Sequence, residues 1–162
     1  MVASILMVAL TGLPFGIASP GPKWHTDYAV AQKQAESAKK PLAVFLAPGK
    51  RGYEKFARDS GLTAEIQETL AFKYVCLHVD TAQTAGKSLA ADFEMPSGLG
   101  IVISDRSGTA QAFRHEGDLA NRDLTRYLVR YADPNRIVTK TESNPGDERP
   151  AANRVILDNC PT

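Results

Sequence analysis

The chain divides into short segments in which the spacing of apolar residues is typical either of a helix or of a buried strand. Apolar residues recur at every third or fourth position in the segments that we expect to be helical. Continuous or β-branched apolar runs, bounded by proline, glycine or polar turns, mark the expected strands. The predicted helices are 24–39, 50–59, 63–70, 86–93 and a last helix that begins at Asn121 or Asp123 and is ended by Asp133-Pro134. The predicted strands are 42–47, 72–79, 100–104 and 109–115.

The order of these elements predicts an α/β fold with a mixed central sheet of about four strands and helices on both faces. The first three predicted strands alternate with helices, which favours parallel neighbours joined by right-handed crossovers. The last two strands are separated by the tight turn Asp105–Gly108, so we expect them to form an antiparallel hairpin.

Polar residues at the expected helix ends support these assignments. Asp27 or Thr26 can cap the first helix, and Thr63 can cap the third, with Gln67 one turn later as its partner. The last helix has an apolar face, which we expect to be buried, made of Leu124, Tyr127, Leu128 and Tyr131.

Residues 1–18 are typical of a secretory signal peptide, because an apolar stretch ends in Gly16-Ile17-Ala18 and the first charged residue is Lys23. An uncleaved membrane anchor and a mis-assigned start are the alternatives, since no Lys or Arg lies near the beginning. We predict 19–23 as a spacer, 24–134 as one domain and 135–162 as a flexible polar tail. The expected protein is exported, periplasmic or secreted, with no membrane span after cleavage.

Composition excludes some classes of function. The net charge of +1, with acids and bases interspersed, argues against a nucleic-acid-binding surface. The histidines and cysteines lack the spacing of metal ligands, and the sequence has no cofactor-binding motif. Cys76 lies within a predicted strand, where a thiol is usually buried and inert, and Cys160 lies in the predicted tail. In an oxidising compartment the alternatives are a Cys76–Cys160 disulfide, a bridge from Cys160 to another chain, and free thiols.

Several short motifs resemble, in order and spacing, those of the thioredoxin family. Together they span residues 24–132, and the resemblance implies the thioredoxin fold. The motifs are Trp24-x-x-Asp27-Tyr28-x-x-Ala31, Lys40-Pro41 before a strand, Phe72–Asp80 with its terminal acid, Leu89-Ala-Ala-x-Phe93, Ile101–Gly108 with its Asp-x-x-Gly turn, and Glu116-Gly117 before the final helix.

The chain departs from the family at the two places that form the family's redox site. Lys50-Arg51-Gly52-Tyr53 stands where the family has Cys-x-x-Cys, and neither Lys nor Tyr replaces an attacking or resolving thiol. The family's cis-proline would fall at Leu99 or Gly100, whereas the nearest proline is Pro96. The resemblance therefore implies the fold without its usual thiol–disulfide chemistry.

From these features we predict a module that binds a protein or peptide in a groove near Lys50, Arg51 and Leu99, rather than an enzyme. Lys50 and Arg51, at an expected helix N-terminus, are also candidates for binding an anion or a carboxylate. Two alternatives stay open. One is an oxidoreductase that uses Cys76 and Cys160 in a non-standard place, and the other is a structural accessory subunit whose tail, 137–162, docks on a partner.

Overall fold

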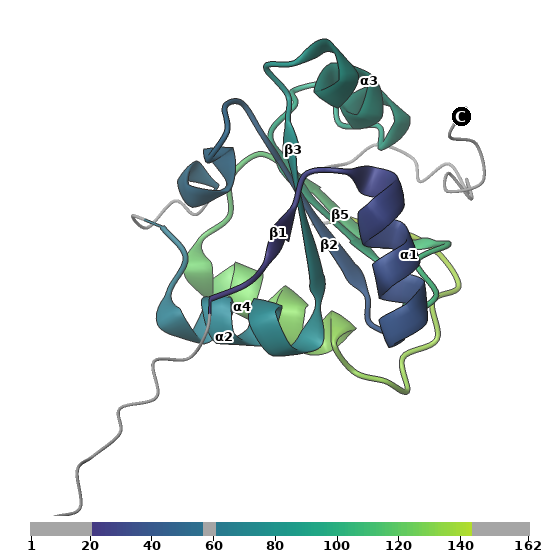
Figure 1. Cartoon of the computed structure of the whole chain (residues 1–162). Helices are drawn as coiled ribbons and strands as arrows, with labels where there is room; N and C mark the ends of the chain where they lie inside the picture. The colour runs from purple at the N-terminus through teal and green to yellow at the C-terminus, as the bar shows by residue number, and fades with distance from the viewer. Residues whose placement is uncertain (1–20, 57–60, 144–162) are drawn as a thin grey trace, which may run out of the picture.

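A computed structural model describes residues 21–56 and 61–143 (Figure 1). A six-stranded sheet forms its centre. The elements in chain order are β1 (Trp24–His25), α1 (Tyr28–Ala38), β2 (Leu42–Ala47), the one-turn 3₁₀ helix η1 (Gly52–Lys55), α2 (Ala64–Lys73), β3 (Val75–Asp80), α3 (Thr84–Asp92), β4 (Gly100–Ser104), β5 (Gln111–Glu116), α4 (Asn121–Tyr131) and β6 (Glu142–Ser143).

The strand order across the sheet is β1-β3-β2-β4-β5-β6. Strands β1, β3 and β2 are parallel, β4 is antiparallel to β2, β5 is antiparallel to β4, and β6 is parallel to β5. The predicted α/β class with a mixed sheet is therefore confirmed. The two strands beyond the expected four are the two-residue edge strands β1 and β6, which are too short to show a period in the sequence.

The third predicted strand does not run parallel to its neighbour, as its place after a helix had suggested. Strand β4 begins opposite Leu46, at the end of β2 where β3 also ends opposite Ala47. Helix α3 lies beyond this edge of the sheet instead of crossing back along it (Figure 1). The chain consequently enters β4 from the edge at which it left β3, and the strand runs in the opposite direction.

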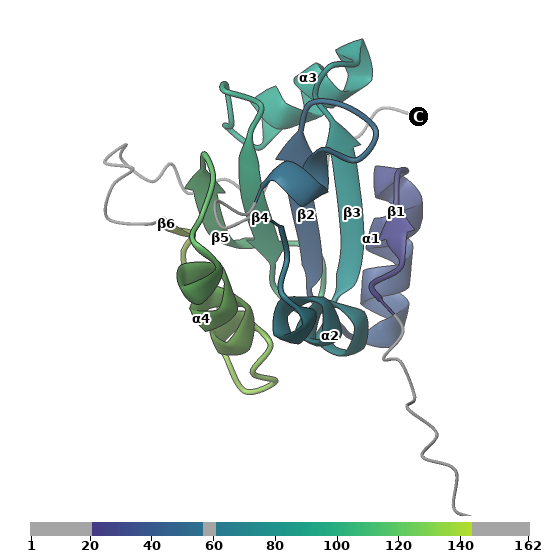
Figure 2. The same cartoon turned by 90° about the vertical axis from the view of Figure 1, so that its left-hand side faces the viewer.

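Helices cover both faces of the sheet, as predicted, with α1 on one side and α2 and α4 on the other (Figure 2). Helix α3, beyond the end of the sheet, adds Ala90 to the core on the α1 side. Each face has its own apolar core. On the α2–α4 side the last helix buries the four residues that its sequence pattern predicts. The large side chains of this core that are less than 2% exposed are Phe45, Phe56, Ile66, Leu70, Ile101, Ile103, Phe113, Leu124 and Leu128. The α1–α3 core includes Leu42, Val44, Leu46, Leu77, Val79, Phe93, Met95 and Val102.

Several helix boundaries differ from those that the sequence predicts. Helix α1 begins at Tyr28 rather than at Trp24, because Trp24 and His25 pair with β3. Its cap is confirmed, since the Asp27 carboxylate accepts a hydrogen bond from the Val30 amide at 2.9 Å. The predicted helix 50–59 is reduced to the single turn η1, while 57–60 lies outside the described residues.

Helix α2 is longer than predicted, and it shortens the strand that follows it. The helix continues to Lys73, so β3 begins at Val75 rather than at position 72. Thr63 caps the helix as expected, with its hydroxyl accepting from the Ile66 amide at 3.3 Å. Gln67 does not close a capping box, since its side-chain amide donates to the Leu62 carbonyl instead.

The chain continues along the sheet past Pro134, where the sequence predicts the flexible tail to have begun. Strand β6 pairs with β5, and Glu142 is held there by three side chains. The Tyr131 hydroxyl donates to Glu142 at 2.6 Å, Arg130 pairs with it at 2.9 Å, and Arg136 also forms an ion pair with it. The remainder of the predicted tail, 144–162, lies outside the described residues, as does the predicted signal peptide.

Candidate functional site

The segment Lys50–Tyr53 lies directly after β2, at the sheet edge where β3 ends and β4 begins. The side chain of Asp80, the last residue of β3, holds this loop in place through hydrogen bonds. Its carboxylate accepts hydrogen bonds from the Gly49 amide at 2.6 Å and from the Ala82 amide at 3.0 Å. These bonds, Gly49 first, lower the pKa of Asp80, because they favour its charged form. Asp80 is therefore a turn-forming residue that ties two loops together.

At Gly52 the backbone of η1 packs directly against the end of β2. A Cβ atom at this position would lie 2.6 Å from the Ala47 Cβ and 2.9 Å from the Ala47 carbonyl carbon. Glycine thus allows the single helical turn to sit directly on the strand. The next residue, Tyr53, is placed above the sheet by this close approach.

Tyr53 is the last of the four residues, Lys50–Tyr53, that the sequence predicts to stand in place of the family's Cys-x-x-Cys. Its ring stacks on Trp24, with centroids 4.2 Å apart and planes at 21°. The Tyr53 and His78 rings also make an edge-to-face contact, with their centroids 5.4 Å apart and their planes at 71°. Below the stack, Trp24 packs edge-on against Phe45 at 5.1 Å. The four rings therefore form one aromatic cluster.

His78 lies beneath Tyr53 on β3 and is only 4% exposed. Its Nε2 atom is buried and has no hydrogen-bond partner among the described residues. Burial lowers the pKa of His78, while hydrogen bonding to the Ala47 backbone and the charge of Asp80 act in the opposite direction. The imidazole is accordingly neutral in the folded protein near neutral pH.

The lowered pKa of His78 predicts a loss of stability in mild acid. As the pH falls below about 6.5, the unfolded chain binds a proton that the folded chain resists, so the free energy of unfolding decreases. His78→Phe removes this titration while keeping a ring against Tyr53. Urea denaturation at about pH 7.5 and about pH 5.5 is expected to show a smaller decrease for the variant than for the parent. An equal decrease in both proteins would contradict the assignment.

Lys50 and Arg51 precede the single turn of η1. Both side chains are exposed, and the Arg51 guanidinium pairs with Glu54, which raises its pKa. The sequence predicts an anion site at a helix N-terminus here. The helix that forms, η1, has only one turn, so few amide dipoles add up at its N-terminus. Anion binding at these two residues stays a prediction.

The loop before β4 uses most of its backbone polar groups internally. The Thr81 hydroxyl donates to the Gly98 carbonyl at 2.7 Å, and the Gly117 amide donates to the Leu99 carbonyl at 2.8 Å. The Leu99 amide donates to the Ser97 hydroxyl at 3.3 Å. Few groups are left here for pairing with an extended substrate, and no cis peptide bond occurs in 21–56 or 61–143.

Cys76 faces the core between the sheet and α2. It is 1% exposed, and its Sγ atom lies 3.7 Å from the Leu70 carbonyl oxygen. Burial raises the pKa of its thiol to about 12, so almost none of it is thiolate at neutral pH. Its thiol is free in the structure, and Cys160 lies outside the described residues. A Cys76–Cys160 disulfide therefore stays one of the alternatives that the sequence leaves open.

A surface groove with a volume of about 490 Å³ runs beside the Trp24–Tyr53 stack, which we call the aromatic groove. Leu99, which the sequence places beside the expected groove, does not line this one and packs against the core. Sequence reasoning missed this place because it treated Trp24 as helical. The lining residues are Gly21, Pro22, Trp24, Tyr53, Glu54, Gly61, Leu62 and Gln67.

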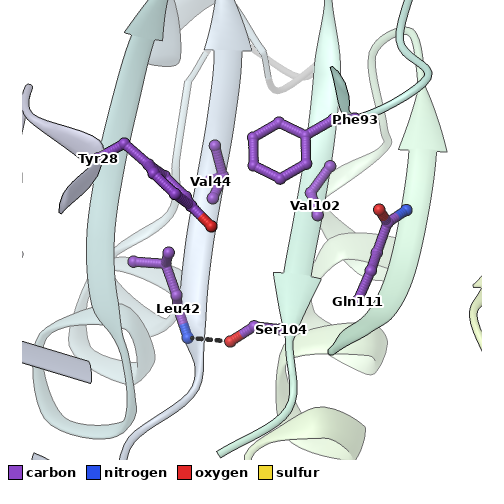
Figure 3. A pocket seen from close by; sticks show the side chains of 7 residues that line it. All are labelled: Tyr28, Leu42, Val44, Phe93, Val102, Ser104 and Gln111. Atoms are coloured by element: carbon purple, nitrogen blue, oxygen red, sulfur yellow. Dashed lines mark hydrogen bonds between the residues drawn. The ribbon is translucent and has the colours of Figure 1, made fainter. Parts of the chain in front are cut away.

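A second, enclosed space lies on the opposite face of the sheet, below Tyr28 and Phe93 (Figure 3). Its volume is about 10 Å³, which is room for about one water molecule. The Ser104 hydroxyl at its floor accepts a hydrogen bond from the Leu42 amide at 2.8 Å, and the buried Gln111 Oε1 has no partner among the described residues. The space is too small for a substrate.

No protein-family model matches the sequence, and comparison with curated proteins finds no match. Solved structures do match. A thioredoxin from Thermus thermophilus aligns at 16% identity with a TM-score of 0.56, covering 68% of this chain and 87% of that one. DsbH oxidoreductase aligns at 16% identity with a TM-score of 0.56, covering 80% and 96%. The fold is that of thioredoxin.

The thioredoxin fold confirms what the ordered sequence motifs imply, and at this low identity it says nothing of activity. The replacement of the family's dithiol by Lys50–Tyr53, and of its cis-proline at Leu99 or Gly100, stays a prediction from the sequence. Within the described ranges no helix is long and apolar enough to cross a membrane.

Proposed function

We propose that this thioredoxin-fold protein is exported and binds an extended peptide or protein segment in the aromatic groove, without catalysing thiol–disulfide exchange. The observation that carries the proposal is the Trp24–Tyr53 stack. The stack forms one wall of a groove of about 490 Å³, and Tyr53 is the last of the four residues that the sequence predicts to replace the family's dithiol.

The groove has the features that peptide recognition uses. Its wall is formed by two half-buried aromatic rings, which offer apolar contact area at low entropic cost. Polar groups at its rim, the Glu54 carboxylate and the Gln67 side chain, are exposed and can orient a peptide backbone. Phe45 and Phe56 support the rings from within the core, since Phe45 packs edge-on against both Trp24 and Phe56.

Thiol chemistry has no support at this site. Disulfide exchange requires an accessible thiolate and a second thiol that resolves the mixed disulfide. The described residues contain one cysteine, Cys76, and its pKa of about 12 and 1% exposure make it a poor nucleophile. The alternative of an oxidoreductase using Cys76 and Cys160 would need a strand to open first.

Binding can be tested through Trp24, the single tryptophan of the chain. Random peptides displayed on phage are selected on the immobilised full chain, and the selected peptides are titrated while Trp24 emission is followed. Tyr53→Ala is expected to weaken binding about tenfold or more, because it removes half of the stack. Val30→Ala changes an exposed apolar residue on α1 and serves as the control.

Peptides that bind Tyr53→Ala as tightly as the parent, or that leave Trp24 emission unchanged, would contradict the proposed groove. Export is tested separately, by the mass of the protein recovered from outside the cytoplasm of producing cells. A mature form that begins at Ser19 would support export, and a form that retains 1–18 within the cytoplasm would contradict it.

A further inference from the structure

A second surface, on the outer side of the α2–α4 layer, exposes apolar side chains. Phe72 on α2 is 53% exposed and Val129 on α4 is 60% exposed. They are two of the four large apolar side chains that are exposed among the described residues, and both line one groove of about 750 Å³, which we call the α2–α4 groove. Paired exposed apolar groups in a hollow are typical of interaction surfaces rather than of solvent-facing helices.

Acidic side chains surround this apolar floor. Glu65 and Glu68 lie along α2, and Asp133 follows the end of α4. Lys73 is the one basic residue among those that line the groove, so three carboxylates and one ammonium leave two negative charges. None of these four side chains forms an ion pair within the part of the chain that the structure describes.

Local helix chemistry accounts for only part of this charge. Glu65 lies in the first turn of α2 and Lys73 in its last turn, where each suits the helix dipole. Asp133 instead follows the C-terminus of α4, which is the negative end of that helix. Glu68 lies in the middle of α2, one turn before the exposed Phe72. The Asp133 carboxylate accepts a hydrogen bond from the Asn135 amide at 2.9 Å, but none of the three carboxylates has an ion-pair partner in the described structure.

We propose that the α2–α4 groove binds a cationic amphipathic helix of a partner protein. Phe72 and Val129 contact the apolar side of that helix, and Glu65, Glu68 and Asp133 meet the Lys or Arg residues that flank it. A hollow between two helices is suited to a third helix, whose ridges of side chains fit between those of α2 and α4. Charge complementarity selects the basic partner and sets the salt dependence of binding.

A second copy of this chain, docked groove to groove, is disfavoured by the same charges. An isologous contact would place two negatively charged rims against each other. The proposal does not depend on the aromatic groove, because the residues that line the two grooves do not overlap.

The test uses the isotope-labelled full chain and an amphipathic helical peptide made only of leucine and lysine, with a matched peptide of leucine and glutamate. The lysine peptide is expected to bind, with amide shift changes concentrated in α2 and the C-terminal half of α4. Phe72→Ser/Val129→Ser is expected to weaken binding about tenfold or more. Glu65→Gln/Glu68→Gln is expected to weaken binding and to reduce its dependence on salt.

Val30→Ser is the control, since Val30 is 53% exposed on α1, on the other face of the molecule. Equal binding of the two peptides, no binding of the lysine peptide, or equal weakening by Val30→Ser would overturn the proposal. Concentration-dependent self-association abolished by Phe72→Ser/Val129→Ser would overturn it in favour of a second copy. Tyr53→Ala is expected to leave lysine-peptide binding unchanged, so failure here is distinguishable from failure of the aromatic groove.

Discussion

Replacing Gly100 by alanine is expected to lower the free energy of unfolding by about 3 kcal/mol. A Cβ atom on Gly100 would lie 2.1 Å from the Met95 methyl carbon and 2.3 Å from the His115 carbonyl oxygen. Met95 can rotate away, but the His115 oxygen belongs to the neighbouring strand β5 and cannot move without disturbing the ladder. The backbone at Gly100 also has φ +156°, within the region that favours glycine. Urea denaturation measures the loss.

Gly117→Ala separates the steric effect from the backbone effect. Gly117 has φ +96°, but nothing lies within 4 Å of where its Cβ would be. Its substitution is expected to cost about 1 kcal/mol, from backbone strain alone. Equal losses for the two variants would show that the crowding at Gly100 is not what requires glycine there.

Replacing Phe45 by alanine is expected to cost about 3–5 kcal/mol. Phe45 is fully buried at the centre of β2, with its ring edge-on to Trp24 and to Phe56, each at 5.1 Å. Removing the ring leaves a cavity and withdraws the support beneath the Trp24–Tyr53 stack. Trp24 emission in the folded variant is therefore expected to shift to longer wavelength, as the indole gains contact with water.

Phe45→Leu and Phe72→Ala serve as controls for the loss of stability in Phe45→Ala. The leucine variant keeps most of the buried volume, so a cost of about 1.5 kcal/mol or less is expected. The exposed Phe72 is expected to change stability by no more than about 0.5 kcal/mol. A loss below about 1 kcal/mol for Phe45→Ala would mean that the core beneath the aromatic groove is not packed as described.

The parts of the fold that the sequence predicts well are those in which burial alone determines the pattern. The apolar run Leu42–Ala47 is covered on both faces, and all six of its residues are buried. The buried face of α4 and the caps Asp27 and Thr63 follow from side-chain periodicity and local hydrogen bonding. These signals depend on near neighbours in the chain, which a sequence displays directly.

The features that the sequence does not predict depend on long-range pairing. Trp24 has the spacing of a helical residue, yet it pairs with Cys76 across the sheet and so begins β1. The direction of β4 depends on α3 lying beyond the sheet edge, which no periodicity encodes. Strand β6 depends on ion pairs of Glu142 with Arg130 and Arg136.

The candidate site divides in the same way. The position of Lys50–Tyr53 after β2 is predicted from the order of the elements. The groove itself is not, because the wall formed by Trp24 and Tyr53 joins residues from two distant segments. Its placement beside Tyr53 follows from the stacking geometry, and Leu99 does not line it because Leu99 packs against the core.

The reduction of insulin disulfides in the presence of dithiothreitol is the most direct measurement of whether this fold has lost its redox chemistry. The full chain, with Cys76→Ser and Cys160→Ser beside it, is compared with dithiothreitol alone. We expect no acceleration from any of the three proteins, because the described thiol is buried with a pKa of about 12 and the sequence predicts Lys50–Tyr53, without a cysteine, in place of the family's dithiol. An acceleration by the parent chain that either serine variant abolishes would contradict the loss of redox chemistry.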